Sequence, residues 1–126
     1  MSEADLSAAT VGQLLIPVSN LDAATEFYGK KLGLKFLFAA PPQMTFYQAG
    51  EVRLLVGVPE NPGAKAAMIY FRVAGIEAVY QTLVSRGVSI PTAPHLVHRA
   101  PNYELWLAEF KDPDGNGLAL MEEKKT

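Results

Sequence analysis

LLIPVSNLDAA, residues 14–24, has a counterpart further along the chain, IYFRVAGIEAV, residues 69–79. In both stretches apolar residues alternate at the start, which is typical of a strand with one buried face. A short turn follows, and apolar residues then recur at helical spacing. An acid, Asp22 or Glu77, falls in the first turn of each expected helix, where negative charge suits the helix dipole. Each half of the chain is therefore predicted to begin with a strand followed by a helix.

The two halves continue alike after these helices. Gly33 and Gly87 follow the helical stretches, as glycine commonly does at the end of a helix. Proline pairs and the turn-forming run Asp112–Gly117 separate the apolar segments that come next. The expected strands are 34–38, 44–48 and 52–56 in the first half, and 88–90, 103–110 and 118–121 in the second.

This order, β-α-β-β-β twice, predicts an α+β fold. We expect a single domain over residues 1–126, with a first module at 10–60 and a second at 64–122 joined at Asn61-Pro62-Gly63. Modules of this size are small for independent stability, so they should pack together around a pseudo-twofold axis. The expected result is a curled mixed sheet around a cavity, with the helices outside.

Composition narrows the function classes. The 126 residues are 49% hydrophobic and 19% charged, which is an ordinary globular balance. The absence of cysteine excludes disulfides, thiolate catalysis and Cys-ligated metals. A net charge of -2 gives no basic footprint for nucleic acid, and no apolar run is long enough for a membrane span. Acids at Glu3 and Asp5 do not suit a secretory signal, so a cytoplasmic location is expected.

Two motifs within this pattern resemble a known family. Val18–Asp22 with Phe27-Tyr28, and then Lys31–Leu34, are similar to the first module of the vicinal oxygen chelate superfamily. Asp112–Asn116 resembles the turn before the last strand of that superfamily. The superfamily includes glyoxalase I, extradiol dioxygenases, fosfomycin-resistance enzymes and bleomycin-binding resistance proteins. The resemblance implies the paired-module fold and a homodimer, whereas it leaves the reaction open because the superfamily spans many activities.

The resemblance also implies where a metal would bind. The matching positions here are Gln13, Met68, Ala119 and, by a less secure count, Leu54. An amide, a thioether and two alkyl groups are poor ligands for the divalent ions that these enzymes use. We therefore expect no cofactor, and a divalent metal is the disfavoured alternative.

Strand alternation predicts which side chains line the cavity. Tyr70 is either a proton donor or a wall residue, and Gln13 either orients a ligand or makes an internal hydrogen bond. Arg72 suits a carboxylate or phosphate, with a surface ion pair as the alternative. Trp106 and Phe110 are further candidates if their strand turns the required face inward. The predicted ligand-binding residues are Gln13, Leu15, Met68, Tyr70, Arg72, Trp106, Ala119 and Met121.

The two histidines, His95 and His98, lie in a proline-rich stretch. A metal site formed with Glu104 or Glu109 is conceivable, but a spacing of three on a regular strand puts the two rings on opposite faces. One histidine could instead act as a general base, because histidine titrates near neutral pH. Exposed loop positions are the default expectation for both.

Two functions follow from these observations. The first is a metal-free protein that binds a small organic molecule in an apolar cavity, in the manner of the bleomycin-resistance members. The alternative is a glyoxalase-like lyase, isomerase or dioxygenase that acts on a small oxygenated substrate. The residues that would catalyse such a reaction cannot be assigned from the sequence.

Overall fold

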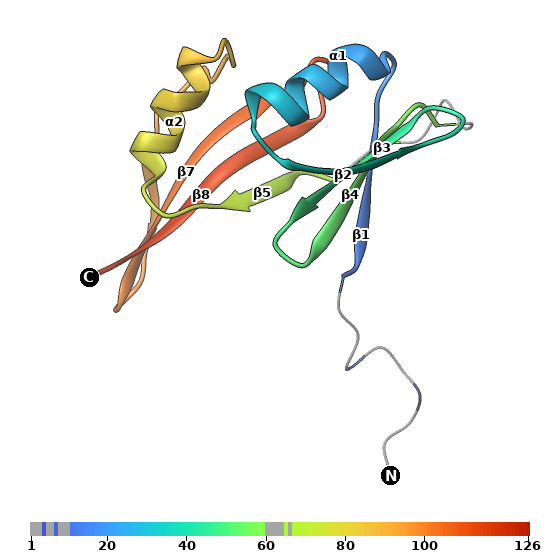
Figure 1. Ribbon diagram of the computed structural model, residues 1–126. Coiled ribbons are helices and arrows are strands. Elements are labelled where there is room, and N and C mark those ends of the chain that lie inside the picture. The colour runs from blue at the N-terminus through green and yellow to red at the C-terminus, as the bar shows by residue number, and fades with distance from the viewer. Residues whose placement is uncertain (1–3, 5–6, 8–10, 60–64, 66) are drawn as a thin grey trace.

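The protein forms two four-stranded mixed sheets, each with its own helices (Figure 1). The computed structural model describes residues 4, 7, 11–59, 65 and 67–126. The expected linker at 61–63 lies outside the described residues. The first module contains β1 (Gln13–Pro17), α1 (Leu21–Thr25), the π-helix η1 (Glu26–Lys31), β2 (Lys35–Ala40), β3 (Met44–Ala49) and β4 (Val52–Gly57). The second contains β5 (Ile69–Arg72), α2 (Ile76–Ser85), β6 (His95–Arg99), β7 (Tyr103–Lys111) and β8 (Gly117–Lys125).

The sheets repeat one topology, as the sequence duplication predicts. The strand orders are β1-β4-β3-β2 and β5-β8-β7-β6. In each sheet the first strand pairs in parallel with the last, and the remaining neighbours are antiparallel. A register shift interrupts the second strand of both modules, between Phe36 and Phe38 in β2 and between Leu96 and His98 in β6. The α+β fold with two β-α-β-β-β modules is therefore confirmed.

One strand of the second module lies elsewhere than expected. Residues 88–90 form no strand, although Val88 and Ile90 are buried in the core. The strand that follows α2 is β6, in the stretch expected to be an exposed loop. Apolar residues in a short run fit a buried loop as well as a strand, so periodicity alone could not separate the two.

The helix ends are stabilised by different kinds of cap. The Asn20 side chain accepts a hydrogen bond from the amide of Ala23 at 3.0 Å and so caps α1. Gly75 precedes α2 with a φ of 78°, and the carboxylate of Glu122 accepts from the amides of Gly75 and Ile76. The predicted helix ends at Gly33 and Gly87 are confirmed by left-handed φ values of 76° and 89°.

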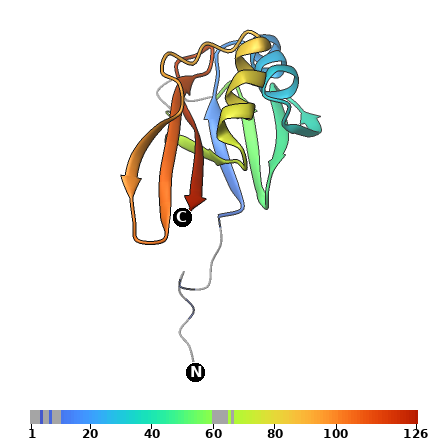
Figure 2. The same cartoon turned by 90° about the vertical axis from the view of Figure 1, so that its left-hand side faces the viewer.

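A single core joins the modules. The largest fully buried side chains are Tyr28, Tyr47, Ile16, Leu54, Ile76, Leu118 and Val56, and they come from both halves. Figures 1 and 2 show the helices together along one side while the two sheets spread away from them. The helix ends also touch, because Nη1 of Arg86 donates to the carbonyl of Lys31 at 3.2 Å. No described helix is long and apolar enough to cross a membrane.

Candidate functional site: an intermodule cavity and two outer sheet faces

Each sheet has a buried face toward the helices and an opposite face that is not covered by them. Along β4 and β8, Leu54, Val56, Leu118 and Leu120 alternate toward the core and are buried. The intervening residues define what we call the outer faces. The first outer face carries Gln13, Leu15, Lys35, Phe38, Phe46, Arg53 and Leu55, and the second carries Tyr70, Arg72, His95, His98, Leu107, Glu109, Ala119, Met121 and Glu123.

The structure divides most of the predicted ligand-binding residues between these two faces. Gln13 and Leu15 lie on the first outer face, and Leu15 is 44% exposed. Tyr70, Ala119 and Met121 lie on the second, with Met68 just ahead of β5 and in contact with Gly117. The two sheets share no strand pairing among the described residues. The predicted ligand-binding residues thus belong to two separate sheets.

Trp106 has the opposite orientation to the predicted one. It pairs with Leu96 and Glu122 on the helix-facing side of β7, where it packs beside the core. Its indole N–H donates to Glu104 at 3.2 Å, and the ammonium of Lys124 lies 4.3 Å from its ring centroid. Alternation along β7 turns Leu105 and Leu107 outward in its place.

Two of the predicted polar binding residues, Gln13 and Arg72, have partners on their own sheets. Arg72 is exposed and its Nη2 lies 3.5 Å from a Glu123 carboxylate oxygen, which is the surface ion pair named as its alternative. The side-chain oxygen of Gln13 accepts from Nε of Arg53 at 2.8 Å. Arg53 was missed by sequence reasoning, because nothing in its local pattern separates it from an ordinary exposed strand residue.

The positions that match the family's metal ligands carry side chains that are weak ligands or no ligands for a divalent ion. Leu54 is 1% exposed and faces the core, so the less secure count is corrected by one residue. The register pairs Leu15 with Leu55 and Tyr70 with Ala119, which makes Leu55 the counterpart of Ala119. Gln13, Met68, Leu55 and Ala119 offer no imidazole or carboxylate. Among the described residues no group of three or more His, Cys, Asp or Glu side chains could hold a metal.

The two histidines lie on one face of a strand, contrary to expectation. The register shift in β6 places His95 opposite Leu107 and His98 opposite Leu105, so both rings project from the second outer face. Glu109 shares that face, whereas Glu104 lies on the other. His95 contacts the carbonyl of Ala93 at 3.1 Å, and the His98 ring packs against Tyr103.

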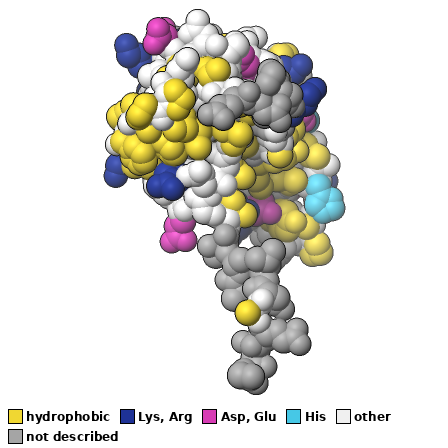
Figure 3. Space-filling model, turned by 90° about the vertical axis from the view of Figure 1, so that its right-hand side faces the viewer, with side chains coloured by type: hydrophobic (Ala, Val, Ile, Leu, Met, Phe, Trp, Pro, Cys, Tyr) yellow, Lys and Arg dark blue, Asp and Glu magenta, His cyan; other side chains and the backbone are white. Residues whose placement is uncertain are grey.

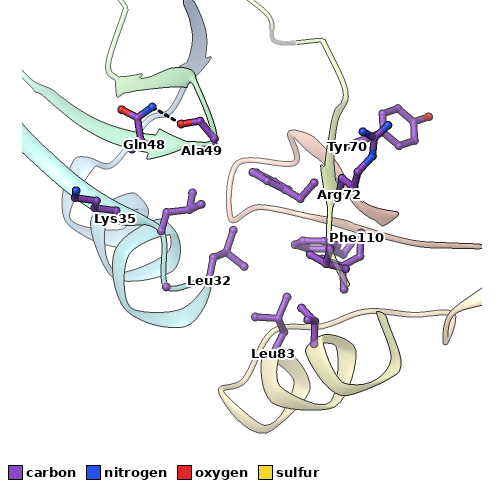
Figure 4. Close-up of a pocket in the computed structure, with 15 residues that line it drawn as sticks. Leu32, Lys35, Gln48, Ala49, Tyr70, Arg72, Leu83 and Phe110 are labelled. Carbon is purple, nitrogen blue, oxygen red and sulfur yellow. Dashed lines mark hydrogen bonds between the residues drawn. The ribbon is translucent and has the colours of Figure 1, made fainter. Parts of the chain in front are cut away.

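A cavity of about 500 Å³ lies where the two modules meet. In Figure 4, Leu32, Leu83 and Phe110 point into this space, while Lys35, Tyr70 and Arg72 lie at its margin and point away. Its remaining apolar walls come from the loop after η1, from β5 and from α2. The lining residues are Leu32, Gly33, Leu34, Lys35, Gln48, Ala49, Gly50, Tyr70, Phe71, Arg72, Val73, Val79, Leu83, Phe110 and Leu120.

The lining of this cavity is mainly apolar. Its lining includes no acid and no histidine, and the amide of Gln48 already donates to the carbonyl of Gly50. Of the predicted residues, Tyr70 and Arg72 reach its margin, and Phe110 lines it from the helix-facing side of β7. Leu32, Val79 and Leu83 belong to the stretches in which apolar residues recur at helical spacing. Their place at the junction could not be foreseen without knowing how the modules pack.

The paired modules define a class of proteins built from duplicated β-α-β-β-β units. The family model for the glyoxalase/bleomycin resistance protein/dioxygenase superfamily matches residues 10–120. The chain belongs to this superfamily and has its vicinal oxygen chelate fold.

Solved structures of the same superfamily are similar over nearly the whole chain. A superfamily member from Sphaerobacter thermophilus is 28% identical, with a TM-score of 0.74 over 91% of this chain and 98% of that one. A lactoylglutathione lyase from Agrobacterium tumefaciens is 22% identical, with a TM-score of 0.71 over 92% and 95%. A protein from Alicyclobacillus acidocaldarius, described by the superfamily name, is 19% identical, with a TM-score of 0.72 over 91% and 92%. The latter two likenesses concern the fold alone. No protein of curated function matches the chain.

Proposed function

We propose that this protein binds a small organic molecule in the intermodule cavity and does so without a metal ion. The observation that carries the proposal is the cavity itself, about 500 Å³ in volume with walls that are mainly aliphatic and aromatic. Pockets for small molecules usually measure roughly 300–1,000 Å³ and have apolar walls with few polar groups. The ligand is expected to be apolar in its body, because Leu32, Leu83 and Phe110 would surround it.

The residues present favour binding over the family's metal-dependent chemistry. Such chemistry needs a divalent ion that polarises substrate oxygens. Gln13, Met68, Leu55 and Ala119 supply one weak ligand between them, and the walls of the intermodule cavity supply none. A lyase, isomerase or dioxygenase reaction is therefore the less supported alternative.

A matched pair of substitutions on α2 tests the cavity. Val79 lines it, whereas Val84 is 44% exposed and does not. We expect the neutral dye N-phenyl-1-naphthylamine to bind with increased fluorescence, Val79→Trp to abolish binding by filling the space, and Val84→Trp to retain it. Equal binding by wild type and Val79→Trp would contradict the proposal, as would equal loss in both variants.

A homodimer, implied by the family resemblance, is part of the proposal. The first strand of each sheet, β1 or β5, is an edge within the described part of the chain, and edge strands readily pair with another chain. Multi-angle light scattering should give a mass twice that of the chain over a range of protein concentrations. A mass equal to that of the single chain throughout would contradict this.

A further inference from the structure

The C-terminal ends of η1 and α2 meet beside the intermodule cavity, and a basic side chain lies at each end. Nη1 of Arg86 donates to the carbonyl of Lys31 at 3.2 Å, so the guanidinium of the second module reaches the helix end of the first. The same nitrogen lies 3.2 Å from the position that a Cβ would take at Gly33, a lining residue of the cavity. The ammonium of Lys31 lies 3.8 Å from the corresponding position at Gly87. Both cations therefore lie at the junction of the modules.

Arg86 continues the face of α2 that lines the cavity. Val79 and Leu83 line it, and Arg86 follows them after seven and three residues, spacings that return to the same face of a helix. Arg86 is the residue that ends α2, and it is exposed. This face of α2 is thus apolar inside the cavity and basic at its solvent end.

The positive charges at this end of the cavity are not neutralised within the described part of the chain. No described carboxylate lies within ion-pair distance of Lys31, Lys35 or Arg86. Lys35 and Arg72 lie at the margin of the cavity (Figure 4), and of these two only Arg72 has an ion-pair partner, Glu123. Because the lining includes no acid, the charge around the cavity is positive.

The helix ends oppose this charge only in part. A helix C-terminus carries about half a unit of negative charge, so the ends of η1 and α2 together supply about one unit. Lys31, Lys35 and Arg86 each carry a full positive charge. Arg86 spends one of its five N–H donors on the carbonyl of Lys31 and keeps the others for a ligand. The balance favours an anion at this place.

We propose that the intermodule cavity binds an amphipathic carboxylate, of which a medium-chain fatty acid is the simplest example. The inference rests on the proposed function, because it names the ligand class of that same cavity. The aliphatic chain lies among the mainly Leu and Val walls, beside Leu32 and Leu83. The carboxylate lies at the basic rim, which we define as Lys31, Lys35 and Arg86, and accepts hydrogen bonds from the remaining donors of Arg86.

Competition against the neutral dye N-phenyl-1-naphthylamine tests the ligand class. Decanoate, decanol and decylamine share an alkyl chain of one length and differ in the charge of the head group at neutral pH. Decanoate should displace the dye at about one-tenth of the concentration that decanol requires, as expected for a charged hydrogen bond, and decylamine should be the weakest. Added salt should reduce the preference for decanoate, because the basic rim is partly exposed to solvent and salt screens such charges.

A pair of arginine substitutions tests the basic rim. Arg86→Gln should lower the preference for decanoate over decanol by about tenfold, and Arg86→Lys should lower it less because the charge remains. Arg99→Gln makes the same charge change on edge strand β6 and should leave the preference unchanged. Since Arg86 also joins the helix ends, thermal denaturation checks that its variants are folded. The comparison of the three head groups in the wild type tests the proposal without any variant.

The exposed apolar surface of the first module is a competing place for an alkyl chain. Figure 3 shows apolar side chains gathered on that side of the molecule, where Phe36 and Phe38 are 51% and 43% exposed. Val79→Trp fills the cavity and leaves this surface unchanged. Calorimetric titration should therefore detect decanoate binding in the wild type and none in Val79→Trp, and equal binding by both would overturn the assignment.

The remaining outcomes separate this inference from the proposed function. Failure of the dye to bind the wild type would contradict the proposed function, and the inference would fall with it. Dye that binds but is displaced equally by decanoate and decanol, or best by decylamine, would leave the cavity as a binding site and overturn the assignment of an anion. Equal effects of Arg86→Gln and Arg99→Gln would overturn the role of the basic rim.

Discussion

The phenol of Tyr28 donates a 2.7 Å hydrogen bond to the carboxylate of Asp112, a residue 84 positions further along the chain. Tyr28 is fully buried in the first module, and Asp112 begins the turn before β8 in the second. Burial first, and then the bond to Asp112, raise the pKa of Tyr28 far above its ordinary value. The bond therefore joins the modules through one neutral donor and one charged acceptor.

Asp112 also organises its own turn. Its carboxylate accepts from the amides of Asp114 and Asn116 and from the side chain of Asn116, which in turn donates to the carbonyl of Pro17. Asp114 accepts from the amide of Ser19. The turn motif recognised in the sequence as a family signature thus holds β1 of the other module in place.

Tyr28→Phe should lower the free energy of unfolding by about 1–3 kcal/mol, because it leaves a buried carboxylate short of one donor. Urea denaturation at neutral pH measures this. Tyr103→Phe is the matched control, since its hydroxyl bonds to no described residue, and it should change stability by less than about 0.5 kcal/mol. Equal effects of the two substitutions would argue against a specific role for the Tyr28–Asp112 bond.

Glu122 should make the protein's stability depend on pH in acid. Hydrogen bonds from the amides of Gly75 and Ile76 lower the pKa of its carboxyl below the ordinary 4.5. A lowered pKa in the folded state means that this stabilisation is complete above pH 4.5 and is lost as pH falls through the folded-state pKa.

Glu122→Gln should therefore be less stable than the wild type by about 1 kcal/mol at pH 7, as for loss of a helix cap. The difference should shrink steadily once the pH falls below 4.5. Urea denaturation across this range is the measurement. A difference that is the same at pH 7 and in acid would show that the charge on Glu122 contributes nothing.

Much of the fold follows from local patterns, whereas the arrangement of the site depends on how the modules meet. The repeat, the helix-ending glycines Gly33 and Gly87, and the turn at Asp112 each reflect short-range backbone preferences that a sequence displays. No residue type in β6 marks the register shift. The position of His95 and His98 on one face of the strand could therefore not be predicted from the sequence. The orientation of Trp106 could not be predicted either, because it depends on which alternate residues of β7 face the helices and not on the composition of the strand.

The end of β4 should tolerate no side chain at Gly57. A Cβ there would lie 2.9 Å from the carbonyl oxygen of Gln43, a backbone atom that also accepts from the amide of Val58. Gly57→Ala should lower the free energy of unfolding by about 1–3 kcal/mol through overpacking. Gly12→Ala, with nothing within 4 Å of its Cβ, should be neutral or slightly stabilising. Thermal denaturation of the two variants should diverge, and matching midpoints would contradict this account.

Metal binding offers the sharpest test of the proposed chemistry. After incubation with Zn, Ni, Mn or Fe(II) and removal of excess, the protein should retain far less than one ion per chain. The reason is that Gln13 is committed to Arg53, while Met68, Leu55 and Ala119 are not ligands for such ions.

Elemental analysis by plasma mass spectrometry gives the metal content. One equivalent that is lost in Gln13→Ala would restore the family's metal-dependent chemistry and remove the metal-free proposal. Loss in His98→Ala instead would place a metal on the second outer face, where the register shift brings His95 and His98 to one side. Either result would make lyase and dioxygenase assays of the loaded protein the decisive next measurement.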